Sequence, residues 1–251
     1  MAKQPAKTDR QAVIEQMRKK QKSAERRRGT VIVATCVIIA LAIVGLAAVP
    51  ILLDKWDSRK LNSTALADLG APASSCQKIT TKKADGNQEH VPVGTPVDYP
   101  ESPPAFGKHW NESGVAPAPF ARKFYTTKDR PEVEALVHNL EHGYTILWYD
   151  ETIADDEDAL ADVKAIAEKY DGTSMRDKFI AAPWTKSDDD EGTFPEGQHV
   201  ALTHWSAGGT GNTDPSKQSG VWQYCSAPSG EAVEEFVKKY PYFDSPEPNA
   251  M

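Results

Sequence analysis

Residues 31–53 read VIVATCVIIALAIVGLAAVPILL, a run of 23 residues without a charged side chain. An α-helix rises about 1.5 Å per residue, so roughly 20 apolar residues are enough to cross the hydrocarbon core of a bilayer. The run is longer than the apolar core of a secretory signal peptide, and it ends without an A-x-A cleavage pattern. We therefore expect residues 31–53 to form one uncleaved transmembrane helix that anchors the chain in a lipid bilayer.

Charge is distributed unevenly on the two sides of this run. Residues 1–30 carry a net charge of +7, whereas the whole chain of 251 residues carries −7, which leaves −14 for the rest. Three arginines (Arg26–Arg28) directly precede the run. The positive-inside rule then keeps residues 1–30 in the cytoplasm as a basic tail and places residues 54–251 outside the plasma membrane. The acidity of that outer part argues against a nucleic acid as a partner.

The outer part is expected to contain a stalk, a folded domain and a tail. Residues 54–89 form the expected stalk and the lead-in to the domain, with a hairpin turn over 78–89 whose tip is Asp85–Asn87. Residues 90–243 form the expected extracytoplasmic domain. Two prolines in 244–251 oppose regular structure, so that segment is expected to be a frayed tail.

Hydrophobic periodicity and turn residues assign the elements of the domain. The expected strands are 90–99, 144–149, 178–184 and 199–205, the expected helices are 131–143, 154–170 and 229–240, and the expected loops are 100–119 and 208–220. Elements in this order predict an α/β or α+β domain with a mixed sheet. A thioredoxin-like sheet is one candidate, although the sequence has no C-x-x-C motif and therefore no redox dithiol.

The three cysteines differ in their expected environment. Cys36 lies inside the apolar run and is expected to behave as a small apolar residue. Cys76 and Cys225 both lie in the outer part, where an oxidising compartment allows disulfides to persist. We expect a disulfide between Cys76 and Cys225.

Two histidines lie one turn apart at the end of the helix expected over 131–143. In the stretch HNLEHG, residues 138–143, the i,i+4 spacing puts His138 and His142 on one flank of the helix with Glu141 between them. Two imidazoles at this spacing can hold one copper or zinc ion. Alternatively, they hydrogen-bond the last carbonyl groups of the helix and have a structural role.

A third metal ligand would have to come from elsewhere in the chain. His109 lies in the loop 102–110, which can cover the helix flank or pack as a compact surface loop. His204, in an expected strand, is the other candidate. The H-x-x-E-H pattern also occurs in inverted zinc peptidases. Only about 110 residues follow it here and the helix stops at Gly143, so a zinc hydrolase is a remote alternative.

Three features in order along the chain carry a resemblance to a known family. They are the loop with Pro103, Pro104, Gly107 and His109, the motif His138–Gly143, and the aromatic strand that ends in Trp148 and Tyr149. Over roughly Val91–Tyr240 they resemble a domain-of-unknown-function family that is common in actinobacterial single-pass membrane proteins and is marked by His-Asn-Leu-Glu-His-Gly. The resemblance implies an anchored envelope domain of no established activity. Its candidate site residues would be His109, His138, Glu141 and His142.

The expected function follows from the single span and from the lack of a recognisable catalytic set. We expect a non-enzymatic accessory subunit whose outer domain docks on a larger membrane complex of the cell envelope, such as a respiratory assembly. Prolines and tryptophans suited to contact surfaces favour this role, which needs no cofactor. The alternative is an extracytoplasmic copper- or zinc-binding protein that uses His138, His142 and His109.

Overall fold

In a computed structural model, the chain forms two compact units, Met1–Leu61 and Asn62–Met251. The structure describes residues 6–84, 88–117 and 122–250. The turn tip expected at Asp85–Asn87 lies outside the described residues.

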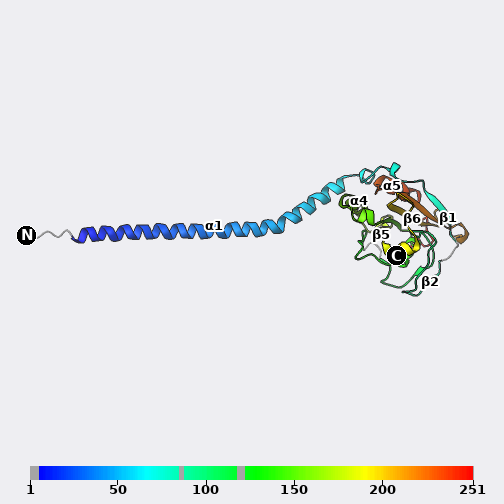
Figure 1. The fold of residues 1–251 in the computed structure, drawn as a ribbon, viewed down its shortest axis with the longest axis horizontal. Helices are drawn as coiled ribbons and strands as arrows, with labels where there is room; N and C mark the ends of the chain where they lie inside the picture. The colour runs from blue at the N-terminus through cyan, green and yellow to red at the C-terminus, as the bar shows by residue number, and fades with distance from the viewer. Residues whose placement is uncertain (1–5, 85–87, 118–121, 251) are drawn as a thin grey trace, which may run out of the picture. The chain divides into compact units, whose positions relative to one another are not determined.

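Helix α1 (Ala6–Ser63), drawn in blue to cyan in Figure 1, makes up the first unit. Its segment Val13–Leu46 is long and apolar enough to cross a membrane. This segment overlaps the apolar run at 31–53, and the helix continues into residues on both sides of that run. The sequence prediction of one N-terminal helix of membrane-spanning length is therefore confirmed.

A five-stranded mixed sheet forms the centre of the second unit, with the strand order β1-β7-β6-β4-β5. The strands are β1 (Thr80–Lys83), β4 (Thr145–Tyr149), β5 (Phe179–Pro183), β6 (Val200–Ser206) and β7 (Ser219–Cys225). Strands β4 and β5 are parallel, and the other three neighbouring pairs are antiparallel. The domain is thus of the mixed α+β class, as predicted.

The helices of this unit alternate with the strands along the chain, and α4 and α5 are labelled in Figure 1. They are α2 (Val133–Glu141), α3 (Glu151–Ala154), α4 (Glu157–Glu168) and α5 (Gly230–Lys239). Helices α3 and α4 lie in the crossover between parallel strands β4 and β5, and α5 follows β7. This connectivity agrees with a thioredoxin-like sheet except between β5 and β6, where residues 184–199, all of them described, contain a 3-10 turn (Lys186–Glu191) and no α-helix.

Helix α2 packs on the sheet through a completely buried apolar face formed by Leu136, Val137 and Leu140. These side chains belong to one hydrophobic cluster with strand residues that include Trp148 and Trp205. Burial of these three side chains of α2 stabilises the fold by several kcal/mol, at about 1.5–3 kcal/mol per side chain. The packing fixes α2 relative to the sheet, and with it the last turn of the helix.

Gly143 ends helix α2, as the sequence predicted. Its φ is +90°, in the region that favours glycine. A Cβ atom at this position would collide with the carbonyl oxygen of Tyr242. The chain can therefore turn from α2 directly into β4 while the C-terminal segment packs against the turn.

Two strands of the five-stranded sheet, β1 and β7, were missed at the sequence level. Strand β1 is polar because it is an exposed edge strand, so its residues show no apolar pattern. Strand β7 begins at the end of the expected loop 208–220. Its Gly220 weakened the strand pattern, yet glycine is needed there because a Cβ atom would collide with the rings of Trp222 and Phe106.

The strand expected at 90–99 is reduced to β2 (His90–Val91). It pairs in parallel with β3 (His109–Trp110) in a separate two-stranded sheet. Two prolines follow β2 in the expected strand, and proline cannot donate to a strand ladder.

The C-terminal segment that we expected to be frayed is held against the domain. Asp244 is buried and accepts hydrogen bonds from Ser206 Oγ and the backbone nitrogen of Gly209, both at 2.8 Å. Further along, Lys178 Nζ donates to the carbonyl oxygens of Pro248 and Ala250, both at 2.9 Å. The local sequence pattern predicted a frayed tail because these interactions are made with residues that are distant in the sequence, and a local pattern does not show them.

The sulfur atoms of Cys76 and Cys225 lie at disulfide distance and join the segment before β1 to the end of β7. We predict that replacing both by serine lowers the free energy of unfolding by about 5 kcal/mol, because the bond joins residues 149 apart in sequence and so restricts the unfolded chain. Urea unfolding of the full-length chain measures this, with Cys36→Ser as the control that leaves stability unchanged. Three alkylatable thiols in the denatured, unreduced protein would contradict the prediction.

Candidate metal centre

Four side chains with metal-ligating atoms converge beside the last turn of α2. The parallel pairing of β2 with β3 places His90 opposite His109. Helix α2 supplies His138 and Glu141, which lie about one turn apart on the same flank. One ligand atom from each of these four residues lies within 4.8 Å of the others. We call this set the inner group.

Glu141 is at the centre of the inner group, and its side chain is only 1% exposed. Its Oε1 accepts a hydrogen bond of 2.7 Å from Gln88 Nε2. Its Oε2 lies 3.0 Å from His109 Nε2 and 3.5 Å from His90 Nε2. Burial raises the pKa of Glu141, but the hydrogen bonds and charges of these partners outweigh it and bring the pKa to about 2. The carboxylate is therefore anionic at neutral pH.

Both ring nitrogens of His109 face an acceptor. Nε2 faces Glu141, and Nδ1 lies 2.9 Å from the carbonyl oxygen of Gly107. The side chain is completely buried. A neutral imidazole carries one N–H and can donate to only one of these acceptors, whereas an imidazolium donates to both. Donation from Nδ1 to a backbone carbonyl is the usual arrangement of a metal-ligating histidine, whose Nε2 lone pair then points at the ion.

His138 connects the inner group with the cavity beside it. Its ring centroid lies 5.3 Å from that of His109 and 4.2 Å from that of His142. Its Nδ1 is buried and has no hydrogen-bond partner among the described residues. Burial, together with the neighbouring imidazoles, lowers the pKa of His138 to about 4. The ring is therefore neutral at neutral pH, as a metal ligand must be.

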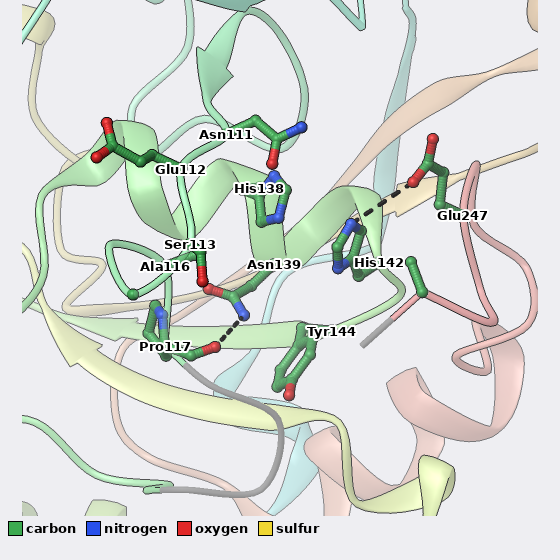
Figure 2. A pocket seen from close by; sticks show the side chains of 12 residues that line it. Asn111, Glu112, Ser113, Ala116, Pro117, His138, Asn139, His142, Tyr144 and Glu247 are labelled. Carbon is green, nitrogen blue, oxygen red and sulfur yellow. Dashed lines mark hydrogen bonds and ion pairs between the residues drawn. The ribbon is translucent and has the colours of Figure 1, made fainter. Parts of the chain in front are cut away.

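A cavity of about 470 Å³ lies against this side of α2. In Figure 2, the rings of His138 and His142 lie next to each other along the helix, and Glu247 reaches toward His142 from the C-terminal segment. Glu247 Oε2 lies 3.6 Å from His142 Nε2. Glu141, His142 and Glu247 also bring one ligand atom each within 4.8 Å of one another. We call this set the outer group.

The site residues predicted from the sequence are divided between these two groups. His109, His138 and Glu141 are in the inner group, and His142 is in the outer group with Glu141. His204 is in neither. It is completely buried, and its ring nitrogens lie 3.2 Å from the carbonyl oxygen of Tyr144 and 2.8 Å from that of Asp244.

His90 and Glu247 were missed at the sequence level. His90 reaches the site because β2 pairs with β3, and two-residue strands leave almost no pattern in a sequence. Glu247 lies in the segment expected to be frayed. Its backbone nitrogen donates to the carbonyl oxygen of Glu141 at 3.0 Å, which holds it near the site. The i,i+4 spacing of His138 and His142 was the one local signal for the site.

The fold and the site define a mixed α+β domain with a partly buried histidine–carboxylate cluster, preceded by a helix of membrane-spanning length. The chain belongs to the family described as protein of unknown function (DUF3105), whose sequence pattern matches residues 90–251. No curated protein and no solved structure matches the chain. The predicted resemblance to a domain-of-unknown-function family is confirmed, and its predicted motif and actinobacterial distribution stay predictions.

The low pKa of His138 predicts how the stability of the metal-free protein depends on pH. The unfolded ring binds a proton near pH 6.5, whereas the folded ring does so near pH 4. The contribution of His138 to stability is therefore complete above pH 6.5 and is lost as the pH falls toward 4. We expect His138→Gln to flatten the pH dependence of the urea midpoint in this window, with chelator present.

His199→Gln is the matched control for this measurement. His199 also faces a carboxylate, because its Nδ1 lies 2.8 Å from Asp150 Oδ2, but it belongs to neither group. The prediction fails if the His138→Gln variant and the unchanged protein lose stability in parallel as the pH falls.

Proposed function

We propose that this protein is a membrane-anchored, extracytoplasmic metal-binding protein. His90, His109, His138 and Glu141 would hold one zinc or copper ion. The convergence of these four residues carries this proposal, because one ligand atom of each lies within 4.8 Å of the others. A metal ion between Nε2 of His109 and Glu141 would take the place of a proton on Nε2, and Nδ1 would keep its proton for Gly107. Imidazole and carboxylate donors suit zinc and copper.

The distances between the ligand atoms also support a metal ion at the inner group. Two atoms that are each about 2.1 Å from one ion at a tetrahedral angle lie about 3.4 Å apart. The Oε2 atom of Glu141 lies 3.0 Å from Nε2 of His109 and 3.5 Å from Nε2 of His90. Small movements of side chains would therefore complete such a coordination shell.

The geometry favours Glu141 as a ligand over Glu141 as a catalytic base. A general base works best with a pKa near the working pH. Glu141 has a pKa of about 2 and is enclosed by Gln88 and His109. A zinc hydrolase therefore remains the remote alternative, and the proposed function is non-enzymatic.

Docking on a larger envelope or respiratory complex stays a prediction, and it is compatible with metal binding. Such a subunit would carry its ion to, or hold it at, a partner membrane protein. We propose metal binding ahead of docking because the metal site rests on contacts between described residues.

Metal affinity tests the proposed function. The full-length chain in mild detergent is stripped with chelator and then titrated with Zn²⁺ or Cu²⁺ against a competing chelator. We expect His109→Ala to weaken binding by at least about 100-fold, since even outer partners of a metal ligand contribute 10–100-fold. His199→Ala is the control and should leave the affinity unchanged. A stripped wild-type chain that takes up neither ion would refute the function.

The proposed localisation needs a test of its own. We expect the N-terminus in the cytoplasm and the domain outside the plasma membrane, because residues 1–30 carry a net charge of +7. Protease added outside intact spheroplasts should cleave the domain and spare an epitope at the N-terminus. Protection of the domain until the membrane is permeabilised would show the opposite orientation.

A further inference from the structure

We propose that the outer group, Glu141, His142 and Glu247, forms a second metal position, and that the carboxylate of Glu141 bridges the two ions. This inference rests on the proposed function, because Glu141 belongs to both groups. It turns a single-ion site into a dinuclear centre that opens on the cavity beside α2.

The contact between His142 and Glu247 has the geometry of two ligands on one ion. Their atoms Nε2 and Oε2 lie 3.6 Å apart. That is longer than a normal N–H···O hydrogen bond, of about 2.9 Å, and close to the separation of about 3.4 Å expected for two ligands at a tetrahedral ion.

Glu247 is held in place although about half of its side chain is exposed. Its own backbone nitrogen donates to the carbonyl oxygen of Glu141, and Lys178 holds the carbonyl oxygens of Pro248 and Ala250 on the following residues. Lys178 Nζ also donates to the carbonyl oxygen of His142 at 2.7 Å. One lysine thus fastens the C-terminal segment to the turn that carries His142.

His138 gives the second, independent observation. Its Nδ1 is buried and unpartnered within the part of the chain that the structure describes. The ring contacts those of both His109 and His142 and borders the cavity, so His138 is close to both groups. A carboxylate that bridges two ions about 3.5–4 Å apart is the arrangement that proteins use for two-metal centres.

The cavity defines what completes the second ion. Three of the described residues form the outer group, which would leave at least one position of a tetrahedral ion open. Because His142 and Glu247 line the cavity of about 470 Å³, that position would face a space with room for water or a small anion. Glu112, which also lines the cavity, adds negative charge near a second cation without joining either group.

Stoichiometry tests the second position. The full-length chain is stripped, dialysed to equilibrium against buffered free Zn²⁺, and analysed for zinc per chain. We expect two ions in the unchanged protein, one in Glu247→Gln and two in Glu112→Gln, the matched control from the same cavity. We also expect His142→Gln to retain one ion. Because His142 follows α2, this result would show that the ion lost in Glu247→Gln is not lost through a disturbed C-terminal segment.

The outcomes separate this inference from the function on which it rests. One ion in both the unchanged protein and Glu247→Gln leaves the proposed function intact and overturns the second position. Two ions in both also overturn it, because the second ion then lies elsewhere. No ion in any variant refutes both proposals. With Cu²⁺, a bridged pair should also weaken the mononuclear spin-resonance signal, and Glu247→Gln should restore it.

Discussion

A buried anion at the end of α2 is the constraint on which the rest of the domain depends. Removing a carboxylate from water costs several kcal/mol unless charges and hydrogen bonds replace the lost solvent. Glu141 obtains them from Gln88 and His109, which belong to segments far from α2 in the sequence. These hydrogen bonds hold the β2–β3 sheet against α2, together with the apolar contacts of Tyr99 and Phe106 in the core cluster.

The apolar core and this polar cluster support each other. Leu136, Val137 and Leu140 fix α2 on the sheet, and the same helix presents its histidines and Glu141 on the adjoining flank. Gly143 then lets the chain turn back into β4 without a Cβ in the way of the C-terminal segment. Precise placement of ligands on a rigid helix is what a metal centre requires, because misplaced donors bind weakly.

Local pattern determined which parts of this structure could be predicted. Helix α2 and strand β4 were predicted because periodicity, Gly143 and β-branched residues all lie within a short window. His138, Glu141 and His142 were found by their helical spacing. His90 and Glu247 were not, because pairing with β3 and contacts with Lys178 bring them in from a distance. Strand β7 was missed because Gly220, required by two aromatic rings, breaks its pattern.

The ligands of the two proposed metal positions extend through nearly the whole domain, from His90 to Glu247. In the proposed orientation, with the anchor entering the membrane first, the second position would be assembled only after the last segment of the chain has emerged. Its metal would therefore be selected after export. Its occupancy would then report the metal supply of the envelope, and the buffered metal pool of the cytoplasm would have no part in choosing the ion.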